Sequence, residues 1–284
     1  MNCATSVVAT RSRPQLLRIL ASQIEASGIS LDQRVLIVGG SADDEQLLRQ
    51  VGFRHIVNSN LPTDMDRLVA GESVPETEHI ALDAEQIDLP NDSFDVVFAS
   101  EVLHHCSSPH RALCEMLRVA RRYIVFMEPN DSLAMTLLVK MRFSFPYELP
   151  AVIAHDYRSG GLRDSHIPNF IYRWNRHEVL KTVSAYIPER IFSVNAYPYW
   201  DFSLTKRDLD LRKATRLGSI TSVMGAGNFI SLLHFAQFFL NWIPPLRSQG
   251  NKFLCYIEKS PDLKPWMARE GEKIVFNREF GHQK

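Results

Sequence analysis

The sequence predicts an α/β fold, in which short buried strands alternate with helices along the chain. Residues 35–38 form a continuous apolar run with charge before it and Gly39 and Gly40 after it. Such a run is typical of a central parallel strand that is buried on both faces. Four further strands are expected at residues 56–57, 79–82, 94–99 and 123–127. Their separation by loops and helical stretches indicates a largely parallel sheet with helices packed on it.

Helical periodicity and end signals place the helices. Residues 11–27 have an amphipathic pattern, and helices are also expected at 43–51, 109–121 and from about 175 to 186. Ser108 is a good N-cap residue and Pro109 suits the first helical position, so this boundary is the best determined in the chain.

The alternating pattern defines one main domain with two insertions. We expect a helical lead-in over residues 1–33, a domain over 34–258 and a peripheral tail over 259–284. Residues 131–170 are irregular, aromatic and rich in proline, which suggests a lid. Residues 198–250 form a second insertion between the last two predicted strands, at 191–194 and 253–257.

Charge and cysteine content exclude several classes of function. Lys+Arg and Asp+Glu both number 32 among 284 residues, so no wide basic field is available for nucleic acid, which we do not expect as a partner. The cysteines have neither zinc spacing nor the density of a disulfide scaffold, which suits a reducing cytoplasm. They are Cys3, Cys106, Cys114 and Cys255. The apolar stretch at residues 4–9 is too short for a signal core, so secretion is not expected.

The turn after the first strand indicates which kind of cofactor can bind. In an open parallel sheet, ligands bind beyond the carboxyl ends of the strands, here at Gly39 and Gly40. The turn lacks the glycine spacing of a dinucleotide site, and Asp43, Asp44 and Glu45 follow it. Two like charges about 4 Å apart repel by about 4 kcal/mol at an effective dielectric of 20, so a pyrophosphate is disfavoured. S-adenosylmethionine has a cationic sulfonium and no phosphate, and it fits this turn. Alternatively, the three carboxylates only complement the helix dipole from solvent.

Residues 79–130 resemble a known family. The motifs are Asp83-Ala84-Glu85, Leu89-Pro90, Asp92-Ser93-Phe94-Asp95-Val96-Val97, Glu101-Val102-Leu103-His104-His105 and Glu128-Pro129. Together they resemble the class I S-adenosylmethionine-dependent methyltransferases with a type 11 methyltransferase domain. Residues 169–174, Asn-Phe-Ile-Tyr-Arg-Trp, resemble a bacterial branch whose members often accompany polysaccharide-biosynthesis genes.

The resemblance implies a Rossmann-like sheet of seven strands, the last antiparallel, and a set of residues that bind the cofactor. Asp83 would accept from the adenine amino group, and Gly39 would let the backbone approach the methionine portion. Asn60 stands where the family has an acidic residue on the ribose, while Ser41 and Asp43 replace glycines, so weaker binding is expected. The implied set is Gly39, Gly40, Ser41, Asn60, Leu61, Asp83, Ala84, Glu85, Ser100 and Glu101.

Methyl transfer needs an aligned nucleophile and, for a hydroxyl acceptor, a base. His104 and His105 follow the fourth strand and are the candidate catalytic residues, although either could be structural. Glu128 either contacts the acceptor or caps the turn after its strand. A zinc site built from these histidines with Cys106, His110 and Cys114 lacks a second ligand pair, so no metal is predicted.

The acceptor is expected to be a small molecule or a glycan or lipid-linked precursor, methylated on oxygen or nitrogen. Acceptor contacts are expected in the first insertion, at His155, Asp156, Tyr157 and His166. Aromatic side chains of the two insertions either line an acceptor pocket or pack in the core. The alternative function is a catalytically silent relative that serves as a binding or scaffolding protein.

Residues 218–246 contain no charged residue and have basic residues on both sides. We expect a helix whose apolar face, containing Phe229, Leu232 and Phe239, packs on the domain or over the substrate pocket. The alternatives are an interfacial helix that brings the enzyme to a lipid-carried substrate at the inner membrane face and, last, a membrane span.

Overall fold

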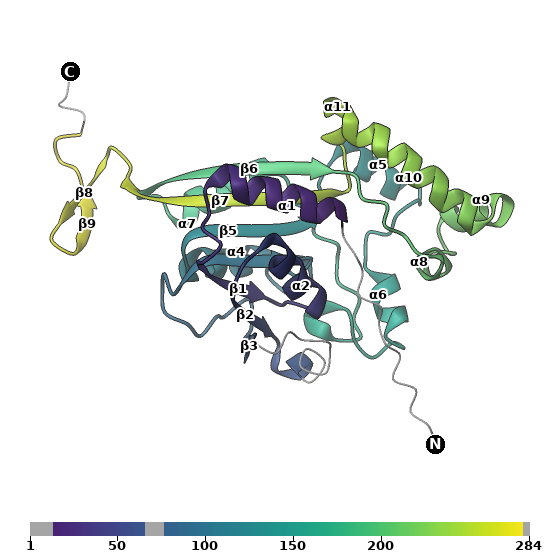
Figure 1. The fold of residues 1–284 in the computed structure, drawn as a ribbon, viewed down its shortest axis with the longest axis horizontal. Coiled ribbons are helices and arrows are strands. Elements are labelled where there is room, and N and C mark those ends of the chain that lie inside the picture. Colours follow the sequence, from purple (N-terminus) through teal and green to yellow (C-terminus); the bar gives the residue numbers. More distant parts are fainter. Residues whose placement is uncertain (1–13, 66–76, 281–284) are drawn as a thin grey trace.

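The computed structural model describes residues 14–65 and 77–280, and its centre is a seven-stranded sheet (Figure 1). The strand order is β3-β2-β1-β4-β5-β7-β6, and β7 alone runs antiparallel to its neighbours β5 and β6. The strands are β1 (Arg34–Val38), β2 (His55–Asn60), β3 (Glu78–Ala81), β4 (Phe94–Ser100), β5 (Ala120–Pro129), β6 (Arg190–Tyr199) and β7 (Lys252–Leu263). This confirms the predicted Rossmann-like class I architecture.

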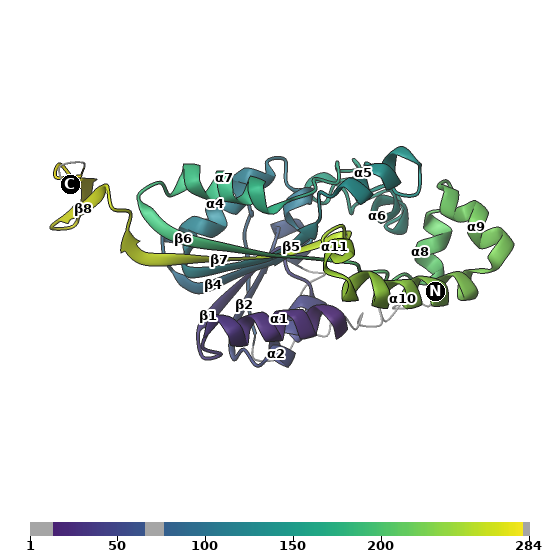
Figure 2. The ribbon, with the colours of Figure 1, turned by 90° about the horizontal axis from the view of Figure 1, so that it is seen from above.

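Helices cover both faces of the sheet. Figure 2 shows α1 (Pro14–Ser27) and α2 (Ala42–Val51) on one face, with α4 (Pro109–Val119) and α7 (Arg176–Tyr186) on the other. Along β1, Val35 and Ile37 pack toward α1 and α2, whereas Leu36 and Val38 belong to the core on the α4 and α7 side. A strand that is buried on both faces must be apolar at every position, which explains the uninterrupted run in the sequence.

The predicted helix boundaries are close to those observed, but one cap is different. Asn175 caps α7, and its side chain accepts from the Glu178 N–H. α4 begins at Pro109 as predicted, yet Ser108 makes no side-chain capping bond. Its backbone N–H donates instead to the Glu85 carboxylate at 2.7 Å. The predicted start of the first helix at residue 11 lies outside the described residues.

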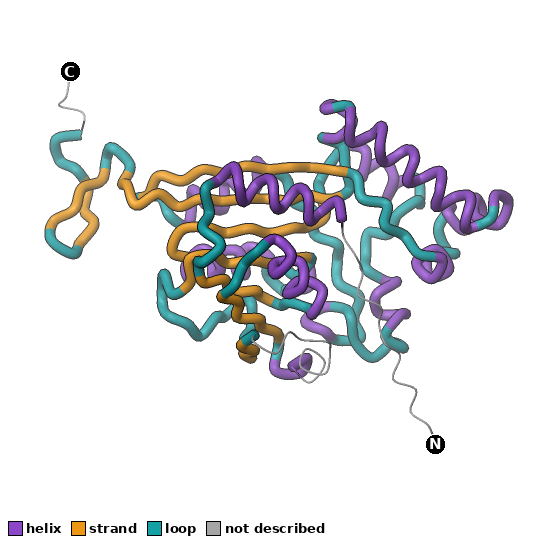
Figure 3. The backbone as a smooth tube through the Cα atoms, viewed as in Figure 1, coloured by secondary structure: helices purple, strands orange, loops and turns teal. Residues whose placement is uncertain are grey.

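Both insertions contain helices (Figure 3). The first holds α5 (Leu133–Lys140), α6 (Leu149–Ala154) and the short 3-10 helix η3 (Leu162–Asp164), and the second holds α8 (Lys206–Leu211), α9 (Arg216–Met224), α10 (Ala226–Trp242) and α11 (Pro244–Arg247). After β7, a hairpin of β8 (Met267–Glu270) and β9 (Lys273–Phe276) lies at the opposite end of the molecule from α9 (Figure 1).

The predicted apolar face of α10 packs on the domain only in part, with Leu233, Ala236 and Leu240 half-buried. Phe229 is the only residue of this helix that is buried, whereas Leu232 and Phe239 are exposed. No single helix among the described residues is long and apolar enough to cross a membrane. α9 and α10 pass that test only as a pair, with a bend of 110° between them.

Candidate active site

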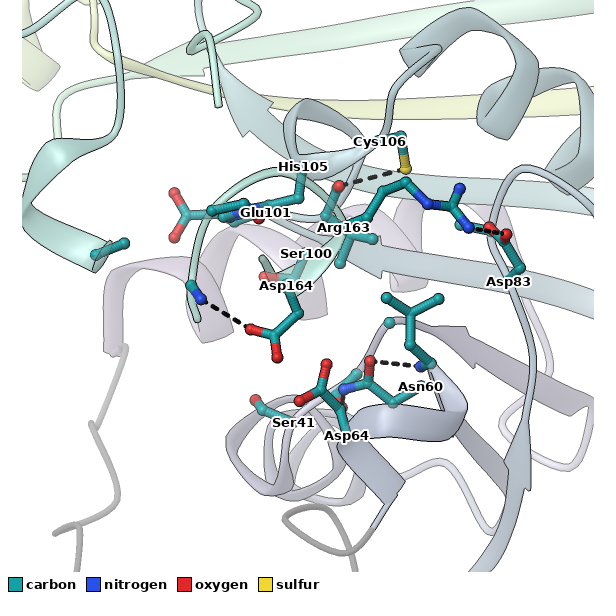
Figure 4. A pocket seen from close by; sticks show the side chains of 18 of the residues that line it. Ser41, Asn60, Asp64, Asp83, Ser100, Glu101, His105, Cys106, Arg163 and Asp164 are labelled. Carbon is teal, nitrogen blue, oxygen red and sulfur yellow. Dashed lines mark hydrogen bonds and ion pairs between the residues drawn. The ribbon is translucent and has the colours of Figure 1, made fainter. Parts of the chain in front are cut away.

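A cavity of about 550 Å³ opens where β1, β2 and β4 end (Figure 4). Segments far apart in the sequence line it, because the carboxyl ends of parallel strands meet at one edge of the sheet. All the residues predicted to bind the cofactor lie on its wall: Gly39, Gly40, Ser41, Asn60, Leu61, Asp83, Ala84, Glu85, Ser100 and Glu101. The structure therefore brings this set together, and the role of each residue remains a prediction.

The glycine turn at the end of β1 has a backbone that other residues would not adopt easily. Gly39 has a φ of 62°, in the left-handed region, and a Cβ at this position would lie 2.6 Å from Cγ1 of Val102. Gly40 donates its N–H to the Ser59 carbonyl at 2.8 Å, which ties the turn to β2. Close approach of the turn to the loop after β4 thus requires glycine at position 39.

The acidic residues after this turn are not simply solvated, contrary to the alternative considered for them. Ser41 and Asp44 form a capping box at the start of α2, and Asp44 is 4% exposed. Glu45 is 1% exposed and accepts from the Thr77 hydroxyl at 2.6 Å. Only Asp44 of the three carboxylates lines the cavity, and it keeps negative charge where a pyrophosphate would have to lie.

Asn60 serves the local backbone in this structure. Its amide donates to the Gly40 carbonyl at 3.2 Å, and its Oδ1 accepts from the Leu61 N–H at 2.8 Å. Asp64, which the sequence analysis missed, lies beside Asn60 and Ser41 on the same wall (Figure 4). A carboxylate is therefore available on this wall even though β2 ends in an amide.

Asp83 and Glu85 lie on the opposite wall and share one partner. Arg163 of η3 places one guanidinium nitrogen 2.6 Å from Asp83 Oδ2 and another 2.7 Å from Glu85 Oε2. Burial alone would raise the pKa of Asp83, but the Glu85 N–H and Arg163 lower it below its usual value. Figure 4 shows Arg163 extended across the cavity toward Asp83, so the first insertion does contact the predicted adenine site.

Glu101 lies at the end of β4 with an uncommon backbone conformation. Its φ is 58°, and its carboxylate contacts the ammonium of Lys252, the first residue of β7. Positive φ in a residue with a Cβ is costly and is concentrated at functional sites. The contact links the antiparallel strand to the loop that carries the two candidate histidines.

Glu128 has neither of the two roles predicted for it. It is fully buried, and its Oε1 accepts from the backbone N–H groups of Val102 and Leu103 at 2.9 and 2.7 Å. Its Oε2 lies 2.5 Å from Nδ1 of His104. Glu128 therefore holds the loop after β4 rather than an acceptor or the turn after its own strand.

His104 and His105 lie in different environments, although they are adjacent in the chain. His104 is buried between Glu128 and Glu148, whereas His105 lines the cavity. Burial lowers the pKa of His104, but the two carboxylates outweigh it and raise the value to about 10. Burial and the charge on His104 lower the pKa of His105. This geometry favours His105 over His104 as a group that receives a proton from an acceptor.

Glu148 of the first insertion completes the histidine pair. Its Oε2 lies 3.1 Å from Nε2 of His104 and 3.3 Å from Nε2 of His105. Burial would raise the pKa of Glu148, but the bond to His104 lowers it to about 2. No local pattern in the sequence marks Glu148, which lies 44 residues from His104.

Most of the acceptor contacts predicted in the insertions are not brought to the cavity. His155 lines it, while Tyr157 is 68% exposed, and Asp156 and His166 are also exposed. Trp174 and Tyr199 are buried in the core, so aromatic side chains do not form the cavity floor. The cysteine-based metal set is likewise not assembled in the described part of the chain.

A second cavity of about 340 Å³ adjoins the first and shares Glu101, Glu148 and Ala151 with it. It extends to α8 and is lined by Asp201, Ser203, Asp208, Arg212, Asn251 and Lys252, among others. In this arrangement His104, His105 and Glu148 would lie between an acceptor in the second cavity and the predicted adenine site in the first. The two cavities thus provide room for two ligands side by side.

Comparison with known proteins defines the class. Residues 38–125 match the family model described as a methyltransferase domain. This segment begins at the last residue of β1, ends within β5 and contains the strand ends that line the first cavity. The segment is therefore similar to a methyltransferase domain.

Curated relatives match about a third of the chain. A ubiquinone/menaquinone biosynthesis C-methyltransferase, UbiE, of Nitrosospira multiformis is 41% identical over 107 residues, or 34% of this chain and 43% of the relative. Its counterpart in Vibrio campbellii is 32% identical over 106 residues, which cover 34% of this chain and 41% of that protein. The chain therefore spans less than half the length of these relatives.

Solved structures resemble the chain over a longer stretch at lower identity. The YcgJ protein from Bacillus subtilis matches with a TM-score of 0.48 and 14% identity, over 87% of this chain and 99% of its own. Magnesium protoporphyrin IX methyltransferase from Synechocystis, solved with bound SAH, matches with a TM-score of 0.45 and 13% identity, over 87% and 83% of the two chains.

Proposed function

We propose that the whole protein transfers a methyl group from S-adenosylmethionine to an acceptor held in the second cavity. The observation that carries this proposal is the convergence of the entire predicted cofactor set on one cavity at the carboxyl edge of the sheet. Asp83 would accept from the adenine amino group in competition with Arg163, and the carboxylate of Asp64 would face the ribose hydroxyls on the wall where Asn60 serves the backbone. The cluster of His104, His105 and Glu148 lies at the junction with the acceptor cavity and would activate the acceptor there.

Titration calorimetry with S-adenosylhomocysteine tests the donor site. We expect one molecule to bind per chain and Asp83→Asn to weaken the binding at least fivefold, because a charge-assisted hydrogen bond becomes a neutral one. Asp262→Asn, in the exposed part of β7, is the matched control and should bind as the unaltered protein does. Absence of heat and of any thermal shift at millimolar ligand would favour the silent scaffolding alternative.

We further propose that the acceptor is a small lipid-linked or glycan precursor that the enzyme meets at the inner face of a membrane. Support comes from α10, in which two amide side chains bond to the protein while a row of large apolar side chains is exposed. Gln237 accepts from the Phe202 N–H and donates to Gln15, and Asn241 exchanges two bonds with the backbone of Trp200. On the other side, an arc of the helix presents exposed apolar side chains: Leu232, Phe235, Phe238, Phe239 and Trp242.

The size and surroundings of this arc match an interfacial helix. Phe235, Phe238 and Trp242 are 64%, 68% and 73% exposed, which is unusual for side chains of this size. Arg216 begins α9 and Arg247 ends α11, so cationic residues flank the apolar surface. Each such residue near an anionic bilayer contributes about 1 kcal/mol, and aromatic residues suit the headgroup region.

Co-sedimentation with vesicles tests this surface. We expect the protein to sediment with vesicles that contain phosphatidylglycerol, and less with pure phosphatidylcholine. Phe238→Glu and Trp242→Glu should abolish sedimentation, while Phe276→Glu, which alters an equally exposed side chain in β9, should not. The membrane contact would be excluded if the α10 variants sedimented as the unaltered protein does, or if the unaltered protein did not sediment. Either result would leave the proposal about S-adenosylmethionine binding unchanged.

A further inference from the structure

We propose that His104, His105 and Glu148 form a binding site for one divalent transition-metal ion, with zinc as the reference ion. One ligand atom from each residue can be chosen so that all three lie within 4.8 Å of one another. Ligands about 2.0–2.1 Å from a tetrahedral zinc ion are about 3.3 Å apart. The separations of Glu148 Oε2 from the two Nε2 atoms, 3.1 and 3.3 Å, match that spacing.

The hydrogen bonds of the two rings direct their Nε2 atoms toward the same oxygen of Glu148. Nδ1 of His105 lies 3.1 Å from the Gly161 carbonyl, which can only accept, so this nitrogen carries the proton. Nδ1 of His104 lies 2.5 Å from Glu128, whose other oxygen already accepts two backbone N–H groups. With both Nδ1 atoms as donors, a metal ion that replaces the proton on Nε2 of His104 would meet the Nε2 atoms of both rings and one oxygen of Glu148.

The surrounding groups are those that support a bound metal. A buried carboxylate behind a ligating histidine, as Glu128 lies behind His104, fixes the ring and raises its basicity. Glu128 and Glu148 together supply two negative charges for a divalent ion. Asn169 is 2% exposed and donates to Glu148 at 3.2 Å, and its Oδ1 has no partner among the described residues. Water on the ion would supply a donor near this buried oxygen.

Three protein ligands leave one position open, as in catalytic zinc sites. Glu148 lines both cavities, so that position lies between the donor and the acceptor. This role rests on the proposed methyl transfer. An acceptor hydroxyl that binds the ion releases its proton to solvent, and its oxygen lone pair forms a bond to the methyl carbon. The carbon–sulfur bond breaks, its electron pair stays on sulfur, and S-adenosylhomocysteine leaves. His105 is then a ligand, and the metal takes over the activation of the acceptor.

The test measures metal directly, independently of methyl transfer. Protein stripped with EDTA is titrated with Zn²⁺ against a chromophoric chelator, and with Co²⁺ while its visible ligand-field bands are recorded. We expect one ion per chain with a dissociation constant in the micromolar range or below. Glu148→Gln and His105→Asn should each weaken binding at least tenfold. His110→Asn is the matched control, because His110 also faces one carboxylate, that of Glu178, but no second histidine.

Several results would overturn this assignment. They are the absence of binding below millimolar metal, unchanged binding in both variants, or loss of binding in Cys106→Ala, which would indicate a thiol ligand on the cavity wall. Thermal unfolding of the EDTA-treated variants shows that they are folded. Titration of the same samples with S-adenosylhomocysteine separates the two proposals: metal binding without nucleoside binding would reject methyl transfer and retain the metal site.

Discussion

Arg163 and Asp83 form a 2.6 Å ion pair in the first cavity, which the predicted cofactor residues line. The two residues are 80 positions apart, and the pair joins the first insertion to the loop after β3. The other oxygen of Asp83 accepts from the Glu85 N–H at 2.9 Å. Both oxygens of the predicted adenine acceptor are therefore engaged, and the adenine amino group must compete with Arg163.

This competition predicts that Arg163→Ala tightens the binding of S-adenosylhomocysteine. The two side chains are 44% and 30% exposed, and ion pairs of this kind contribute between 0 and about 1 kcal/mol. We expect a gain of up to about fivefold in affinity by calorimetry. Arg158→Ala removes the same charge from the same insertion and should change nothing. Weaker binding by Arg163→Ala would instead indicate that Arg163 closes over the nucleoside.

A second prediction concerns Asn60, where the family usually has an acid. Asn60→Asp should not improve cofactor binding, because a carboxylate cannot donate to the Gly40 carbonyl as the amide does. We expect a loss of about 1 kcal/mol in the free energy of unfolding, measured with urea. A gain in affinity for S-adenosylhomocysteine would contradict this assignment of the amide.

Asp64 provides a complementary test on the same wall. If its carboxylate binds the ribose, Asp64→Asn should weaken the binding of S-adenosylhomocysteine at least fivefold. The same substitution should leave binding of adenine alone unchanged, since the base lies toward Asp83. Titrations with the two ligands measure this difference, and equal losses for both would assign Asp64 a structural role.

A pH dependence follows from His104. In metal-free protein its pKa is about 10, against about 6.5 when unfolded, so the folded form keeps a proton that the unfolded form has released. The stabilisation is complete below about pH 6.5 and is lost as the pH rises toward about 10, by at most about 1.4 kcal/mol per pH unit. Urea unfolding in EDTA across this range measures it.

Glu148→Gln is the variant that isolates this contribution. It removes one of the two carboxylates that hold the proton, so the pKa of His104 moves closer to its unfolded value. The pH-dependent loss should then be smaller and should end at a lower pH. Parallel curves for the two proteins would show that other groups cause the dependence.

Much of the sheet, and the placement of the predicted cofactor residues around one cavity, could be found from the sequence. The apolar run of β1 predicts a strand that is buried on both faces of a parallel sheet. Pro109 has no backbone N–H to donate, so it predicts the first position of α4. The cofactor residues follow strand ends, and parallel strands bring their ends together whatever the loops contain.

The contacts made by the insertions could not be found in this way. Arg163 and Glu148 reach the site from irregular chain with no periodic pattern, and their partners are many positions distant. The facing of α10 was predicted only in part, because all of its apolar positions were assumed to face the core. Gln237 and Asn241 take the inner positions instead, since they satisfy backbone groups of the chain after β6.

Lys252 connects the second insertion to the loop after β4. It is the first residue of β7, directly after the helical segment that carries the outward apolar arc, and its ammonium contacts Glu101 beside the histidine loop. If that segment moved on meeting a bilayer, the shift would reach Glu101 on the wall of the first cavity through this contact. Membrane binding by α10 and the conformation of Glu101 in the first cavity would then be coupled through Lys252.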